Sequence, residues 1–201
     1  MNFVGIEFEL KFRATPGLQV AIREAFPGAE QKFDMQTTYY DTPDGALAEQ
    51  FCTLRRRMEN DVSVCTLKTP AGALGRGEFE LQGELTADTV KELCKLAGKE
   101  ELVAALAKGI VPVCGASFTR LAKTLTPEGC TVELALDSGV LTGGGKAAAL
   151  CEVEVELKEG SREAAAAFAR KLATDFGLMP ETKSKFRRAL DLAKGGNDGT
   201  T

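Results

Sequence analysis

The chain has 201 residues, 44% hydrophobic and 27% charged, which is enough to bury one sizeable core, and we expect a single domain. Its formal net charge of -4 argues against a general nucleic-acid-binding protein, because phosphate contacts normally require an excess of lysine and arginine. Histidine is absent, which excludes Ser-His and Cys-His nucleophile systems and removes the commonest zinc ligand. Any catalysis must therefore use carboxylates, lysines, arginines and a metal ion.

Two further features concern location. No apolar run approaches the length of a membrane span, and the first residues lead into a strand pattern without a signal-peptide core. The six cysteines are scattered through apolar segments and show no metal-binding spacing, so we interpret them as small buried hydrophobic residues. We predict a soluble, cytoplasmic protein.

The segment from Ile6 to Arg13 alternates strictly between apolar and charged residues, which predicts a β-strand. Glu7, Glu9 and Lys11 share one parity with Arg13. An ordinary half-buried strand with its charges in water has the same pattern. This segment alone therefore does not distinguish a solvated face from a functional one.

The other elements follow from periodicity, capping residues and turn residues. Thr15 and Pro16 begin a helix that ends at Pro27-Gly28, and Ser161 begins a long helix that ends at Gly177. Strands are predicted at 36–41, 52–58, 62–68, 76–82, 117–125, 131–140 and 150–158, with two helices between 90 and 109 and a last segment at 182–193. Residues 1–193 form the predicted domain, and the glycine-rich residues 194–201 are predicted to be a disordered tail or a linker.

Charged residues share one face of every long strand. The set comprises Glu7, Glu9, Lys11, Arg55, Arg57, Lys68, Glu78, Glu80, Arg120, Glu133, Asp137, Glu152, Glu154 and Glu156. A curved sheet with this face in water remains one interpretation. We favour a closed barrel with a polar lumen, because like charges on neighbouring strand positions repel and glutamate and lysine are poor strand formers.

A cavity with both signs of charge suggests metal-phosphate chemistry. Carboxylates are the ligands that Mg²⁺ and Mn²⁺ prefer, and Glu-x-Glu on a strand presents two of them on one side. Lysine and arginine bind phosphate, arginine through its planar guanidinium. By contrast, Gly143 to Lys146 lacks the serine or threonine of a phosphate loop and is predicted to be a hairpin turn.

Several motifs resemble the CYTH superfamily, the triphosphate tunnel metalloenzymes. The first strand carries the pattern Glu7-x-Glu9-x-Lys11, which resembles the ExExK signature of that family. Motifs in the family's order also begin at Tyr39, Leu54, Thr66, Glu78, Glu133, Glu152 and Ser184, so that the resemblance covers roughly residues 3 to 190.

The resemblance implies an α+β fold, with an eight-stranded antiparallel β-barrel whose tunnel is polar and helices packed on the outside. It implies catalytic roles for Glu7, Glu9 and Lys11, and metal binding by Glu7, Glu9, Glu152 and Glu154. The implied triphosphate-binding residues are Lys11, Arg55, Arg57, Lys68, Arg120 and Lys185. Glu78, Glu80, Glu133, Asp137 and Glu156 are further acidic candidates, and Tyr39 and Asp41 either line the tunnel or end a strand. Arg13, Arg76, Arg187 and Arg188 are interpreted as rim charges.

The family implies a divalent-metal-dependent hydrolase of inorganic triphosphate, with Mg²⁺ or Mn²⁺. Thiamine or nucleoside triphosphates are the alternative substrates, and a non-catalytic polyphosphate-binding module is the alternative class. The His-Phe pair of the family's cyclases is replaced here by Met1 and Asn2, which disfavours a cyclase. A C-terminal CHAD domain in a longer parent chain is a possible partner.

Overall fold

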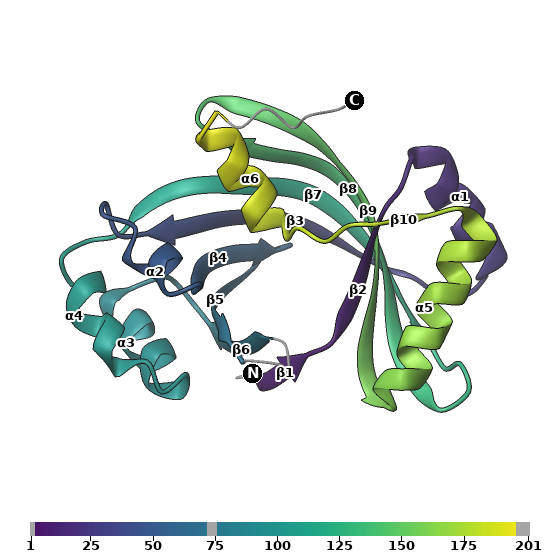
Figure 1. Ribbon diagram of the computed structural model, residues 1–201, viewed down its shortest axis with the longest axis horizontal. Helices are drawn as coiled ribbons and strands as arrows, with labels where there is room; N and C mark the ends of the chain where they lie inside the picture. Colours follow the sequence, from purple (N-terminus) through teal and green to yellow (C-terminus); the bar gives the residue numbers. More distant parts are fainter. Residues whose placement is uncertain (1–2, 72–75, 196–201) are drawn as a thin grey trace.

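The computed structural model describes residues 3–71 and 76–195, with side chains from Glu7 onward. Its strands are β1 (Phe3–Glu7), β2 (Glu9–Arg13), β3 (Gln31–Asp41), β4 (Thr53–Glu59), β5 (Val62–Pro70), β6 (Arg76–Gln82), β7 (Val111–Leu125), β8 (Cys130–Gly143), β9 (Lys146–Gly160) and β10 (Met179–Pro180). They form one antiparallel sheet in the order β1-β6-β5-β4-β3-β7-β8-β9-β2-β10. Figure 1 shows this sheet curved over itself.

The first strand joins the two ends of the curved sheet. The sequence predicts one strand over residues 6–13, but the structure divides it at Phe8 into β1 and β2. β1 pairs with β6, whereas β2 pairs with β9 at the other end of the sheet order. Counted as one strand, β1 and β2 together with β3 to β9 make the eight strands predicted for the tunnel, and the predicted tunnel fold is confirmed. Among the described residues, however, β1 and β2 do not pair with each other, so the hydrogen-bonded sheet is not closed into a ring.

Two helices cover the outer face of β2, β8 and β9. They are α1 (Pro16–Ala25), capped by Thr15, and α5 (Arg162–Phe176), capped by Ser161. Ile22 and Leu172 pack with Val132, Leu134 and Val153 in one buried cluster. Because these strand residues alternate with the charged ones, burial of the apolar parity directs the charged parity toward the lumen.

A second group of helices covers the outer face of β4, β5 and β6 on the opposite side of the molecule (Figure 1). It comprises α2 (Ala46–Glu49), α3 (Ala87–Leu96), the 3-10 helix η2 (Glu100–Leu102) and α4 (Val103–Leu106). Leu47, Leu93 and Leu102 pack there with Leu54 and Leu67. None of the helices within residues 3–71 and 76–195 is long and apolar enough to cross a membrane.

The last helix, α6 (Lys185–Ala193), is an exception to the expectation that helices pack on the outside. Its residues Ala189 and Leu190 cluster with Tyr39, Phe118 and Leu141. Tyr39 lies opposite Arg55 in the β3–β4 ladder, and Phe118 shares the parity of Arg120, so this cluster occupies the lumen-facing side of the sheet. Helix α6 therefore lies inside the curve of the sheet and brings its own charged residues to the lumen.

Candidate active site

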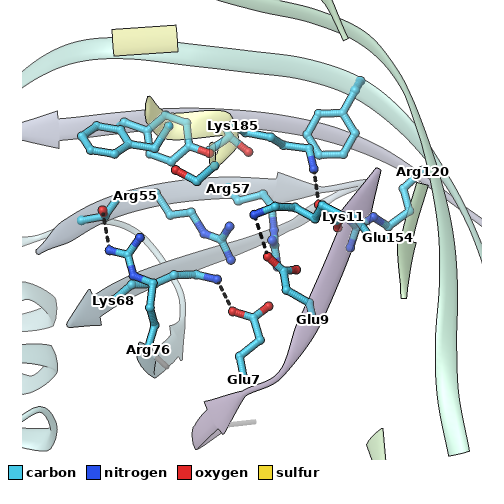
Figure 2. Close-up of a pocket in the computed structure, with 16 residues that line it drawn as sticks. Glu7, Glu9, Lys11, Arg55, Arg57, Lys68, Arg76, Arg120, Glu154 and Lys185 are labelled. Carbon is cyan, nitrogen blue, oxygen red and sulfur yellow. Dashed lines mark hydrogen bonds and ion pairs between the residues drawn. The ribbon is translucent and has the colours of Figure 1, made fainter. Parts of the chain in front are cut away.

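A central cavity of about 120 Å³ lies where β1 to β7, β9 and the start of α6 face one another (Figure 2). Among the described residues, its charged lining comprises Lys11, Arg55, Arg57, Lys68, Arg76, Arg120 and Lys185 together with Glu7, Glu9 and Glu154. Seven cationic side chains therefore surround three carboxylates, in a chain whose net charge is -4. Such a concentration of positive charge in an acidic protein favours an anionic ligand.

The interrupted first strand supplies three of these residues. Glu7 comes from β1, and Glu9 and Lys11 come from β2. The Lys11 ammonium donates to Glu9 Oε1 at 3.1 Å, and Lys68 on β5 donates to Glu7 Oε2 at 2.5 Å. Each carboxylate thus has a cationic partner, and both lie on one wall of the cavity (Figure 2).

The opposite wall comes from β4, β5 and β6. Arg55 Nη2 lies 3.0 Å from Glu78 Oε1, and Lys68 Nζ lies 3.1 Å from Glu78 Oε2. Arg57 pairs with Glu59 and lies 3.8 Å from Glu80. The Nε of Arg57 is buried and has no hydrogen-bond partner among the residues that the structure describes, so this guanidinium keeps donor capacity for a ligand.

A buried acidic cluster surrounds Lys185 at the start of α6. Its Nζ lies 2.8 Å from Asp137 Oδ2, 2.8 Å from Glu152 Oε1 and 2.7 Å from Glu154 Oε1. Arg120 donates two hydrogen bonds of 2.8 Å to Asp137 and also contacts Glu154. Burial opposes ionisation of Glu154, but Lys185 and Arg120 outweigh it and lower the pKa of this carboxyl well below its usual range.

Two other carboxyl groups shift in the opposite direction. Burial, together with the nearby charges of Glu154 and Glu7, raises the pKa of Glu9. Burial also raises the pKa of Glu152, although Lys185 and Arg188 oppose this shift. Closely spaced carboxylates with raised pKa values gain from a bound cation, because the cation offsets both the burial and the mutual repulsion.

A second cavity of about 420 Å³ shares Glu7, Arg55, Arg57 and Arg120 with the central one. Four of the five further acidic candidates line it, namely Glu78, Glu80, Glu133 and Glu156, whereas Asp137 does not. Burial raises the pKa of Glu156, whose carboxylate lies 2.8 Å from Lys158 Nζ. The lumen therefore continues from a cationic centre toward a more acidic end.

Tyr39 and Asp41, which the sequence predicts either to line the tunnel or to end a strand, have different positions in the structure. Tyr39 lines the central cavity, and its ring centroid lies 5.1 Å from that of Phe186 on α6. Asp41 does not line it; its carboxylate accepts hydrogen bonds from the backbone N–H groups of Thr42, Leu47 and Ala48. Asp41 therefore stabilises the turn into α2, which is a structural role.

The prediction of rim charges is wrong for two of the four arginines. Arg76 lines the central cavity, and Arg188 binds the buried carboxylate of Glu152. Arg13 and Arg187, in contrast, keep 68% and 61% of their side chains exposed. The Ser184 to Arg188 segment shows helix periodicity, and Arg188 follows Lys185 by three residues, which places both on one helix face. This spacing is the signal that could have identified Arg188.

The carboxylates of the site suit a hard divalent cation, which prefers oxygen ligands. Glu7, Glu9 and Glu154 line the central cavity directly. Asp137, Glu152 and Glu154 offer oxygens within 4.8 Å of one another, but the Lys185 ammonium lies among them. The fourth predicted metal ligand, Glu152, is fully buried and faces Lys185 and Arg188 in this conformation.

The model of the CYTH domain family matches residues 5–190 of the chain. The chain belongs to the CYTH domain family. An inorganic triphosphatase of Haemophilus influenzae is 27% identical over 196 residues, which are 93% of this chain and 55% of that protein. A thiamine-triphosphatase of Macaca fascicularis is 36% identical over 99 residues, 48% of this chain and 42% of that protein. The chain thus spans about half the length of the curated CYTH relatives it matches.

Solved structures support the CYTH fold. HpAC1 from Hippeastrum, a proposed adenylyl cyclase with a dominant triphosphatase activity, matches with a TM-score of 0.64 and 20% identity over 94% of this chain and 96% of that one. The PH1819 protein of Pyrococcus horikoshii matches with a TM-score of 0.62 and 21% identity over 92% and 99% of the two chains. At these identities the similarity shows the fold alone.

Proposed function

We propose that this CYTH domain hydrolyses inorganic triphosphate to diphosphate and phosphate, with Mg²⁺ or Mn²⁺ as its metal. The observation that carries the proposal is the central cavity, in which seven lysine and arginine side chains of the described residues surround Glu7, Glu9 and Glu154. Cations for the phosphates and carboxylates for a metal are the two components that phosphoryl transfer requires.

Cationic residues on different walls of the cavity would each bind part of a triphosphate. Lys11 and Lys185 lie toward the β2 and β9 wall, and Arg55 and Lys68 lie toward the β4 and β5 wall (Figure 2). Arg120 is fixed by its two hydrogen bonds to Asp137, which leaves its orientation set before a ligand binds. Side chains already held in place stabilise developing charge at little reorganisation cost. Arg57 completes the predicted substrate-binding set.

Glu7, Glu9, Glu152 and Glu154 are the residues that we propose to hold the metal. Of these, Glu7, Glu9 and Glu154 face the cavity directly, so they are the groups best placed to bind an ion beside the phosphates. A bound divalent ion neutralises phosphate charge and makes a bound water more acidic. In this role Glu7 and Glu9 must be ionised, and Lys11 beside Glu9 favours the ionised form.

We choose inorganic triphosphate as the substrate because the described side chains that line the central cavity are predominantly charged. Such side chains can bind phosphate groups without contacts to an organic group. The name of the Haemophilus influenzae relative agrees with this choice, and the name of the Macaca fascicularis relative favours thiamine triphosphate as the alternative. A module that binds polyphosphate without hydrolysing it would use the same cations but would not need the carboxylates.

Phosphate release from tripolyphosphate, ATP and thiamine triphosphate with Mg²⁺ or Mn²⁺ tests the proposal. We expect Glu9→Gln and Lys11→Met to lower kcat/KM by roughly 10- to 100-fold, since a hydrogen bond to a charged group contributes about 1.5–3 kcal/mol. Lys95→Met is the matched control, because this α3 lysine is 69% exposed. The absence of hydrolysis with either metal would contradict the proposal, and binding without turnover would favour the non-catalytic module.

The cellular setting is part of the same proposal. All six cysteines are free thiols, which fits a reducing compartment such as the cytoplasm. A following CHAD domain stays a prediction, and residues 196–201, where the predicted tail or linker continues, lie outside the described residues.

A further inference from the structure

Arg76 differs from the other cations of the central cavity in its partners (Figure 2). Each of the other cations in the described lining forms an ion pair with at least one carboxylate, namely Lys11, Arg55, Arg57, Lys68, Arg120 and Lys185. Arg76 forms no such pair with any residue that the structure describes, and its hydrogen-bond partners are uncharged. Its positive charge is therefore not offset by a carboxylate of this part of the chain.

Two glutamates lie near Arg76 along the backbone but pair with other cations. Glu7 is opposite Arg76 in the β1–β6 ladder, and Glu78 follows two residues later on β6. The Glu7 carboxylate contacts Lys68, and the Glu78 carboxylate contacts both Lys68 and Arg55. A guanidinium without a carboxylate partner at the wall of a cavity attracts an anion more strongly than one that is already paired.

Two uncharged acceptors hold the Arg76 guanidinium in place. Its Nη2 donates to the Phe51 carbonyl oxygen at 3.2 Å and to Thr53 Oγ1 at 3.1 Å. The Nε and Nη1 atoms donate to none of the described residues, so the N–H groups on these two nitrogens remain for a ligand. The side chain therefore combines a fixed position with unused donors.

The Phe51 carbonyl belongs to the turn that ends α2. Phe51 has a φ of 55°, in the left-handed region that glycine usually occupies at the end of a helix. The Cys52 N–H donates to the Leu47 carbonyl oxygen at 2.9 Å across this turn. Because the Phe51 carbonyl accepts from Arg76, a backbone position that is unfavourable for phenylalanine helps to orient a cavity cation.

Arg76 also marks one end of the central cavity. A neighbouring cavity of about 540 Å³ lies between α2 and α6, and Arg76 lines both cavities. Thr53, Ser184 and Phe186 are the other residues that the two linings share. A linear phosphate chain in the central cavity would therefore meet Arg76 at its end and not at its middle.

We propose that Arg76 binds a terminal phosphate of the triphosphate, and that the Phe51 carbonyl and the Thr53 hydroxyl position it for this contact. This inference rests on the proposed function, because it concerns the same ligand in the same cavity. Binding gives Arg76 an anionic partner without breaking an ion pair between described residues. Arg76 thus joins the substrate-binding residues, although the sequence interprets it as a rim charge.

Two substitutions separate the charge of Arg76 from its hydrogen bonds to the turn. Arg76→Gln removes the charge but keeps N–H groups that can donate to the Phe51 carbonyl, whereas Arg76→Lys keeps the charge. Arg56→Gln is the matched control, because Arg56 on β4 also donates to a hydroxyl, that of Ser63 at 3.0 Å, but does not line the central cavity. Unfolding followed by circular dichroism confirms that each variant is folded before its affinity is measured.

The measured quantity is the calorimetric affinity for tripolyphosphate in EDTA, which removes divalent ions so that the proposed hydrolysis cannot consume the ligand. We expect Arg76→Gln to weaken binding roughly 10- to 100-fold, the effect of losing a hydrogen bond to a charged group, and Arg76→Lys to lose less. Arg56→Gln should stay within about twofold of wild type, as expected for a surface substitution. Affinity of Arg76→Gln within about twofold of wild type, the result of a purely structural role, would overturn the inference. Equal affinities of Arg76→Lys and Arg76→Gln would also overturn it.

A hydrolysis assay distinguishes failure of this inference from failure of the proposed function. Wild-type protein that binds tripolyphosphate in EDTA but hydrolyses it with neither Mg²⁺ nor Mn²⁺ contradicts the proposed function, and the affinities of the variants still decide the role of Arg76. Wild-type protein that hydrolyses tripolyphosphate, together with unchanged affinity in Arg76→Gln, contradicts the role of Arg76 alone. Wild-type protein without measurable affinity in EDTA would overturn the inference, because the cavity cations should bind the phosphates without a metal.

Discussion

Gln19 of α1 is a buried polar residue that connects the two strands carrying the acidic cluster. Its Nε2 donates to the carbonyl oxygens of Asp137 at 3.0 Å and Glu152 at 2.9 Å. Its Oε1 accepts a hydrogen bond of 2.5 Å from the Ser138 hydroxyl. Asp137 and Glu152 are paired directly across β8 and β9, so Gln19 fixes the backbone at the point where both carboxylates face Lys185.

The first prediction concerns this residue. Gln19→Leu leaves buried carbonyl groups without their donor, which costs about 1–3 kcal/mol per unsatisfied group, and we expect the free energy of unfolding to fall by about 2 kcal/mol. Urea unfolding followed by circular dichroism measures the loss. Gln31→Leu, at an exposed position of β3, is the control and should change the free energy by less than about 0.5 kcal/mol. Equal effects of the two substitutions would show that the Gln19 hydrogen bonds contribute nothing.

The residue scale also shows what the sequence can and cannot predict. Strand alternation is local, so the parity of Glu7, Glu9 and Lys11 correctly places them in one cavity. Gln19 is different, because its partners lie 118 and 133 residues away and no local pattern indicates them. Asp41 follows a strand in either interpretation, and only the hydrogen bonds to α2 assign it to the turn.

Helix α6 is the element whose position the sequence does not determine. Its periodicity predicts a helix, but the surface that receives it is formed by residues of β3, β7, β8 and β9. That surface combines Tyr39, Phe118 and Leu150 on the lumen side, which can be recognised only when the strand register is known. The division of the first strand at Phe8 also cannot be predicted from the sequence. The alternation of apolar and charged residues continues through Phe8, while the pairing partner changes from β6 to β9.

Ion pairs on one face of α6 hold it in the lumen. Lys185 contacts the three carboxylates of the acidic cluster, and Arg188 contacts Glu152 and lies 3.5 Å from Glu181. The carboxylates of Glu152 and Glu181 are almost completely buried, and Arg188 is one of two cationic partners of each, beside Lys185 for Glu152 and Arg13 for Glu181. Arg187, one residue earlier, pairs with Asp191 on the helix surface at 3.0 Å.

The second prediction compares these neighbouring arginines. Arg188→Met leaves the buried carboxylate of Glu152 with Lys185 and that of Glu181 with Arg13 as the remaining cationic partner, and we expect a loss of about 1.5–3 kcal/mol in the free energy of unfolding, the usual contribution of a hydrogen bond to a charged group. Arg187→Met removes an exposed pair and should cost less than about 0.5 kcal/mol. Chemical denaturation gives both values. Hydrogen exchange of α6 adds the location of the effect, since protection should fall first in α6, and a loss spread evenly over the chain would contradict the role of Arg188 as an anchor.

At the scale of the molecule, the lumen charges that favour a tunnel also oppose folding, because folding brings like charges close together. The central cavity concentrates cations from β2, β4, β5, β6, β7 and α6, and its carboxylates come from β1, β2 and β9. Partial compensation within the protein is visible in the pairs of Lys11 with Glu9, Lys68 with Glu7 and Arg55 with Glu78. The strict alternation of charge along several strands favours this enclosed arrangement, because like charges on neighbouring strand positions repel one another and glutamate and lysine are poor strand formers.

A ligand in the cavity would connect walls that belong to opposite ends of the sheet order. β1 and β2 are consecutive in the chain, but they pair with β6 and β9 respectively, so the two ends are joined covalently at Phe8. A metal-bound triphosphate that contacts Glu9 on β2 and Arg55 on β4 would add a noncovalent link across the lumen. Its binding energy should therefore stabilise the whole fold rather than one loop.

The third prediction follows from this geometry. Tripolyphosphate at 100 times its Kd, with Mg²⁺ present, adds about 2.7 kcal/mol to the free energy of unfolding, and 1 kcal/mol shifts the Tm of a domain of this size by about 2–4 °C. We therefore expect the Tm of wild-type protein to rise by roughly 5–10 °C in a calorimetric scan too rapid for substantial hydrolysis. Lys11→Met lowers the affinity of the cavity, so at the same ligand concentration its Tm should rise less, whereas Lys95→Met should respond as wild type does. A ligand-induced shift that is the same in all three proteins would place the bound phosphate outside the central cavity.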